Sequence, residues 1–74
     1  MLKEINAEYI ISLICKIYKR RKKTSLLRTI PFLTSLANFC FTHGYLTDQQ
    51  KISIFNIYSV YKTEKDIQKK TSTL

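Results

Sequence analysis

The chain has 74 residues with one Gly, one Pro, 45% hydrophobic residues and a formal net charge of +8. This length suits one small domain, and the apolar content is too high for an intrinsically disordered chain. Because β-folds need many tight turns, the scarcity of Gly and Pro argues against an all-β architecture and favours helices. We predict an all-α fold, with one helical domain over residues 1–68 and a frayed polar tail over residues 69–74.

The first helix is predicted over residues 3–22. Apolar residues recur there at spacings of three and four, from Ile5 to Tyr18. Glu4 and Glu8 lie in the first turns, whereas all the cations except Lys3 lie at the far end. Both placements suit the helix macrodipole, so charge helps to define the direction of this helix.

The second helix is predicted to begin near Pro31, because proline has the backbone angle that the first helical turn requires. Residues 24–25 mark a break before it, and residues 26–27 could form a short turn of helix. The second helix carries no Asp, Glu, Lys or Arg. We expect it to end at His43 and Gly44, because glycine suits the left-handed position after a helix and imidazole suits the negative helix end.

The third helix is predicted to begin at Thr47 and to run to about residue 66 or beyond. Thr47 and Gln50 have the spacing of a capping box, in which each side chain bonds the other residue's backbone N–H. Residues 51–61 are also rich in β-branched and aromatic residues, which favours a strand. The capping box and the apolar stripe decide for a helix. The expected architecture is a small three- to four-helix bundle in which helices 2 and 3 form an antiparallel hairpin.

The predicted core combines apolar residues from all three helices. We expect it to include Ile10, Leu13, Ile14, Ile17, Leu33, Leu36, Cys40, Ile54, Ile57 and Tyr58. Cys15 and Cys40 both lie in apolar stretches, far apart and without the spacing of a zinc site or a redox pair. We therefore expect both cysteines to be buried as free thiols in a reducing compartment.

The beginning of the chain does not have the pattern of a signal peptide, because Glu4 lies where a basic region is expected. The most apolar stretch, residues 9–18, is interrupted by Ser12 and Lys16 and is too short to span a membrane. These features predict a soluble protein of the cytoplasm.

Enzyme activity is not expected. The chain has one histidine, His43, so it lacks a paired-histidine metal site, and Gly44 is alone, so there is no glycine-rich phosphate loop. A pair of acid and base groups also needs a cleft that so small a bundle hardly provides. We predict no catalytic residues, no metal site and no cofactor.

Charge is distributed unevenly along the chain. Residues 1–28 carry eight Lys or Arg against two Glu, whereas residues 29–50 carry no Lys or Arg and one Asp. A concentration of this kind favours a polyanionic partner, although basic charge can also merely keep a small domain soluble. The candidate binding residues are Lys16, Lys19, Arg20, Arg21, Lys22, Lys23 and Arg28.

Four of these cations, Lys16, Lys19, Arg20 and Lys23, would share one face of a continuous helix. Such a face would neutralise phosphates of DNA or RNA with little reading of base sequence. Exposed tyrosines could add stacking to bases, but we interpret Tyr18, Tyr58 and Tyr61 chiefly as core residues.

Two functions therefore lead the interpretation. The first is a non-catalytic protein that binds nucleic acid or a nucleoprotein complex. The second is a modulator or inhibitor of another protein, which would use the same cations against an acidic protein surface. An amphipathic anchor on a membrane surface ranks third, because the other helices need the first helix as a packing partner. A homodimer would also bury surplus apolar residues of so small a chain.

One segment has a further pattern, Phe-x-x-Ser-Leu over residues 32–36, then Gly-x-Leu-Thr from Gly44, then Gln50 and an Ile-Tyr pair at residues 57–58. It resembles a short helical hairpin that recurs in small phage and bacterial proteins and covers about a third of this chain. The resemblance implies a phage-type accessory protein associated with DNA or RNA metabolism. A phage-encoded chain would act in the host cytoplasm, and the second function would then be that of a modulator or inhibitor of a host enzyme. It transfers no functional residue.

Overall fold

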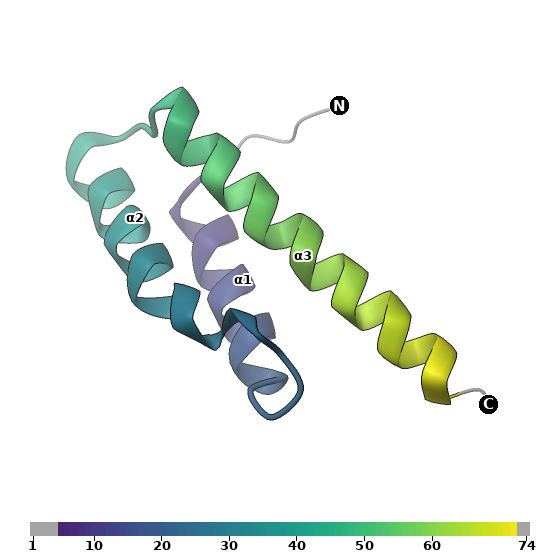
Figure 1. Cartoon of the computed structure of the whole chain (residues 1–74). Coiled ribbons are helices and arrows are strands. Elements are labelled where there is room, and N and C mark those ends of the chain that lie inside the picture. Colours follow the sequence, from purple (N-terminus) through teal and green to yellow (C-terminus); the bar gives the residue numbers. More distant parts are fainter. Residues whose placement is uncertain (1–4, 73–74) are drawn as a thin grey trace.

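The computed structural model describes the backbone of residues 5–72 and the side chains of residues 5–67. Over this part of the chain the elements are α1 (Ala7–Lys19), the short 3₁₀ helix η1 (Leu26–Thr29), α2 (Ile30–His43) and α3 (Asp48–Ser72). The predicted small all-α bundle is confirmed (Figure 1). Residues 51–61 are helical, so the competing strand interpretation is wrong.

Helix α1 is shorter than the predicted helix over residues 3–22. At its start, Asn6 has an extended backbone, and its Oδ1 accepts a hydrogen bond of 2.9 Å from the Tyr9 N–H. This cap satisfies one of the free donors of the first turn and defines where the helix begins. At its end, the chain leaves the helix after Lys19, and residues 20–23 form turns. Successive cations at helical spacing repel one another, which disfavours a longer helix.

The predicted ends of the other helices are confirmed. Gly44 closes α2 with a φ of 78°, and its N–H donates to the Cys40 carbonyl at 2.8 Å. At the start of α3, the Thr47 N–H donates to Gln50 Oε1 at 2.9 Å, and the Gln50 N–H donates to Thr47 Oγ1 at 3.2 Å. Pro31 lies in the first turn of α2. Each of these helix ends depends on contacts between residues a few positions apart, so the local sequence is enough to predict it.

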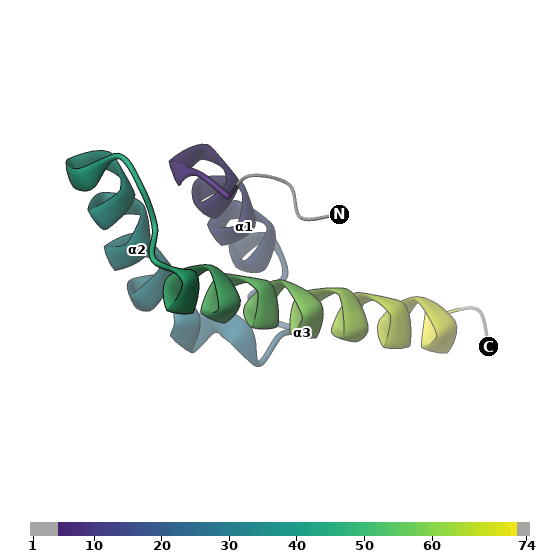
Figure 2. The same cartoon turned by 90° about the horizontal axis from the view of Figure 1, so that it is seen from above.

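The helices pack unequally. α1 and α2 make the most extensive contact, whereas α3 lies across α1 and η1. The predicted hairpin of the second and third helices is therefore not the main packing interface. Both views show the C-terminal half of α3 extending beyond the α1–α2 pair (Figures 1 and 2). This extension makes the molecule elongated, with dimensions of 47 × 26 × 17 Å.

The core lies where α1, η1, α2 and α3 meet. Of the ten predicted core residues, six are buried and Ile14, Cys40, Ile57 and Tyr58 are partly buried against them. The prediction did not include four further buried residues: Ala7, Leu26, Ala37 and Leu46.

Cys15 is exposed, so its predicted burial is wrong. It lies on the side of α1 away from Ile10 and Ile17, because five residues on a helix rotate a side chain to the far face. Both cysteines are free. None of the helices in the described part of the chain is long and apolar enough to cross a membrane. Helix α3 continues to Ser72, past the predicted domain end at residue 68, and residues 73–74 of the predicted tail lie outside the described residues.

Candidate functional site

The basic run at the end of α1 does not form the single helical face that its spacing predicted. Lys16 and Lys19 lie on α1, but Lys23 lies in the turn beyond the helix. The chain curls back there, and the Lys23 N–H donates to the Arg20 carbonyl at 2.7 Å. The run is therefore divided between a helix and a turn, and its side chains point in several directions.

Two residues of the run lie toward α3. The Arg20 side chain is half-buried, and its guanidinium carbon lies 5.9 Å from the centre of the Tyr61 ring. Lys16 is one helical turn earlier and is exposed beside the same helix. These positions place the end of α1 beside a second group of cations on α3.

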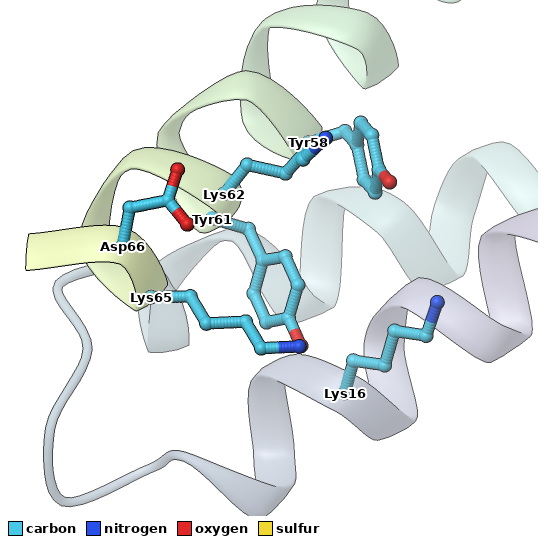
Figure 3. A pocket seen from close by; sticks show the side chains of 6 residues that line it. All are labelled: Lys16, Tyr58, Tyr61, Lys62, Lys65 and Asp66. Carbon is cyan, nitrogen blue, oxygen red and sulfur yellow. The ribbon is translucent and has the colours of Figure 1, made fainter. Parts of the chain in front are cut away.

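A groove of about 270 Å³ separates α1 from the C-terminal half of α3. Its lining residues are Lys16, Tyr58, Tyr61, Lys62, Lys65 and Asp66. Figure 3 shows Lys16 on one side and the α3 residues on the other, with the tyrosine rings between them. Three lysines against one aspartate give the groove a net positive charge, so it favours an anionic group.

The tyrosines give the groove a packed wall. The rings of Tyr58 and Tyr61 are nearly parallel, at an angle of 25° and a centroid distance of 6.3 Å. The Lys62 Nζ lies 5.9 Å from the centre of the Tyr58 ring. Tyr9 of α1 extends the cluster, with its ring 6.1 Å from that of Tyr58. Burial, and to a lesser degree the neighbouring Tyr58, raises the pKa of Tyr9 above its ordinary value of 10.0. The predicted core interpretation therefore holds for Tyr61, which is buried, and in part for Tyr58.

A carboxylate on α3 holds the turn that follows the basic run. Glu64 Oε1 accepts a hydrogen bond of 2.5 Å from the Thr24 hydroxyl. Glu64 Oε2 accepts from the Ser25 hydroxyl at 2.6 Å and from the Ser25 N–H at 3.2 Å. Thr24 also accepts from the Leu26 N–H at 3.1 Å, so the same contact supports the start of η1. Glu64 thus fixes the turn to α3.

These donors stabilise the ionised form of Glu64. The Ser25 hydroxyl has the largest effect, followed by the Thr24 hydroxyl, and together they lower the pKa of Glu64 below its ordinary value of 4.5. Partial burial acts in the opposite direction, and the Ser25 N–H and the charge of Arg20 add further lowering. Glu64 is therefore ionised at neutral pH and functions as an acceptor rather than as an acid.

The other predicted site residues are exposed. Lys19, Lys22 and Arg28 are accessible to solvent, the last of them on η1. Arg21 is exposed too, and its guanidinium carbon lies 4.7 Å from the centre of the Tyr18 ring. Tyr18 is 55% exposed, so its interpretation as a core residue is wrong.

Sequence reasoning did not include Lys62, Lys65 or Glu64 in the site. A signal was present, since lysines follow Tyr58 and Tyr61 at a spacing of four, which places each pair on one side of a helix. That spacing did not reveal that Lys16 would face these residues.

We define the basic surface as the groove together with the turn that follows α1. Its cations are Lys16, Lys19, Arg20, Arg21, Lys22, Lys23, Lys62 and Lys65. Within the described residues, no three His, Cys, Asp or Glu side chains come close enough together to hold a metal ion.

A second feature of the surface is apolar. Phe32, Phe41 and Tyr45 are between 45% and 69% exposed. They lie on α2 or directly after it, in the stretch that carries no Lys, Arg, Asp or Glu. Fold and surface together define a small helical protein with a basic surface and an uncharged helix, α2, on or directly after which aromatic side chains are exposed. Comparison with protein-family models, curated proteins and solved structures finds no match to this chain.

Proposed function

We propose that this chain is a non-catalytic protein of the cytoplasm that binds nucleic acid through the basic surface. The observation that carries the proposal is the meeting of Lys16 with Lys62 and Lys65 across a groove that adjoins the basic turn. Cations from two helices and a turn can then contact successive phosphates of one strand. The resemblance to phage-type accessory proteins of DNA or RNA metabolism agrees with this function.

The mechanism is neutralisation of phosphates and release of their counterions. Lysine suits this role, because its ammonium group is a flexible point charge that does not require one fixed geometry. Glu64 contributes indirectly, since its hydrogen bonds to Thr24 and Ser25 hold the turn that carries four of the cations. Such contacts position a strand and carry little information about base sequence.

The experiment is a salt titration of binding to a labelled oligonucleotide, followed by fluorescence anisotropy. For each phosphate contact, the slope of log affinity against log salt is about −0.9 on duplex and about −0.7 on a single strand. The Lys62→Ala variant should reduce the magnitude of this slope by about one contact. Lys51→Ala is the matched control, because Lys51 is exposed on the same helix about 16 Å nearer its start. Equal slopes for the two variants would contradict a role for the groove.

A second candidate is a protein-binding modulator, such as an inhibitor of a host enzyme. The exposed aromatic side chains on or directly after the uncharged helix α2 favour it, because large exposed apolar residues are typical of protein interfaces. The basic surface would then meet an acidic protein. Capture from lysate with and without nuclease separates the candidates. A single stoichiometric protein that remains after nuclease treatment and at moderate salt would overturn the nucleic-acid proposal.

A further inference from the structure

The last turn of α1 presents an aromatic ring to solvent directly before the basic turn. Tyr18 is 55% exposed, although it directly follows Ile17, which is fully buried. Tyr9, Tyr58 and Tyr61 by contrast pack against one another between α1 and α3. Tyr18 therefore differs from the tyrosines of the groove in leaving a large part of its ring available for contact.

Arg21 lies beside this ring and is fixed there by two contacts. Its guanidinium carbon is 4.7 Å from the ring centre, and its Nη1 donates to the Tyr18 carbonyl at 3.3 Å. The helix ends between these two residues, which lets the Arg21 side chain fold back over Tyr18. The result is a pair of flat, exposed groups, one aromatic and one cationic, held next to each other.

Such a pair suits the face of a nucleobase. Aromatic rings and guanidinium planes both stack on bases, and such stacking is tolerant of sequence because every base has a π-face. The bases of a duplex already stack on one another, so their faces are covered. A single strand leaves these faces free. Lys19 and Lys22 are the sequence neighbours of Tyr18 and Arg21, and both are exposed, so their ammonium groups are available to the phosphates of the same strand.

We infer that Tyr18 and Arg21 form a stacking platform for an unpaired base, so that the nucleic acid bound by the basic surface is single-stranded. This inference rests on the proposed function and adds the class of ligand. The shared chemistry is an unpaired base in a phosphodiester chain, which single-stranded DNA and RNA both provide. The lysines of the groove contribute affinity for any strand, whereas Tyr18 contributes the preference for one that is unpaired.

The test compares four probes of equal length: oligo-dT, oligo-U, a DNA duplex, and an abasic DNA strand that keeps the phosphates but lacks bases. Stacking of one base on an aromatic side chain is worth a factor of roughly 5 to 150 in affinity. Wild-type protein should bind oligo-dT or oligo-U more tightly than the abasic strand by a factor in this range. The stronger of the two identifies the preferred sugar.

Substitution of Tyr18 separates stacking from charge. Tyr18→Leu should reduce binding of the base-containing strand to the level of the abasic strand, while Tyr18→Phe should retain the wild-type preference. Tyr45→Leu is the matched control, because Tyr45 is 57% exposed but lies outside the basic surface. Circular dichroism establishes that each variant remains helical.

The outcomes distinguish the two proposals. If the abasic strand binds as tightly as oligo-dT and oligo-U, or if Tyr18→Leu retains the preference, the stacking platform is wrong while binding to phosphates stands. If none of the four probes shows salt-dependent binding, the proposed function itself fails and the platform fails with it.

Discussion

Replacing Glu64 by Ala removes the carboxylate that ties the turn after α1 to α3. Three hydrogen bonds are lost, from the Thr24 hydroxyl, the Ser25 hydroxyl and the Ser25 N–H. A hydrogen bond to a charged group contributes about 1.5–3 kcal/mol where it is buried. Glu64 is partly exposed and water can replace its donors, so we expect a total loss of about 1–2 kcal/mol. In a domain of this size, that corresponds to a decrease in Tm of roughly 4–16 °C.

The effect should depend on pH in a defined direction. The pKa of Glu64 is lowered in the folded protein, so the folded state binds this proton less readily than the unfolded state. Its contribution to stability is therefore present above the ordinary value of 4.5 and decreases as the pH falls through the folded pKa. The difference in unfolding free energy between wild type and Glu64→Ala should be largest near pH 7 and smaller near pH 3.

Urea unfolding followed by far-ultraviolet circular dichroism measures this difference at each pH. Glu64→Gln should lie between wild type and Glu64→Ala, because its amide keeps one acceptor oxygen in place of two and carries no charge. Asp66→Asn is the matched control, since it removes one negative charge from the same helix at an exposed position and should change stability by less than about 0.5 kcal/mol. A loss for Glu64→Ala that equals the control, or that is the same at pH 7 and pH 3, would refute the reasoning.

Three further outcomes follow from the packing and the helix ends. Thr47→Ala should lower the unfolding free energy by about 1 kcal/mol in urea titrations because it removes the cap of α3, and no loss would show that the capping box is not formed in solution. Leu33→Ala should lower the unfolding free energy by about 2–5 kcal/mol, because Leu33 is fully buried. The matched control is Leu27→Ala, which should have a much smaller effect because Leu27 is 42% exposed. Similar losses for the two variants would contradict the observed core. In an alkaline titration followed by tyrosine absorbance, Tyr9→Phe should remove a component that ionises above pH 10.0. Because the pKa of Tyr9 is raised in the folded state, the stability that its neutral form contributes is lost as the pH rises beyond 10.0. If Tyr9→Phe instead removes a component that ionises at the ordinary tyrosine pKa of 10.0, the burial of Tyr9 is contradicted.

The helix ends show how far local sequence determined this fold. The capping box of Thr47 and Gln50 and the left-handed Gly44 were both predicted and are both observed. Each involves groups within three or four positions of one another, so their geometry follows from the helix itself. The start of α1 was missed although Asn6 carries a similar signal, because the apolar periodicity extended past it.

The arrangement of the basic surface could not be predicted from the local sequence. Periodicity placed Lys16, Lys19, Arg20 and Lys23 on one face, but this result assumed a helix that continues through residue 22. The chain turns after Lys19, and its turn is held by Glu64 from forty residues further along the chain. No local pattern around the cations indicates such a partner.

The sequence by itself determined an all-α chain, the identity of most core residues, the ends of α2, the start of α3 and the concentration of positive charge near the end of α1. These features depend on composition and on interactions within about one helical turn. Only the tertiary structure decided that Lys16 faces Lys62 and Lys65 across a groove and that Tyr18 remains exposed beside Arg21. The physical reason is that the angle at which α3 crosses α1 depends on how the core side chains fill the space between the helices, and that angle determines which of their surfaces meet.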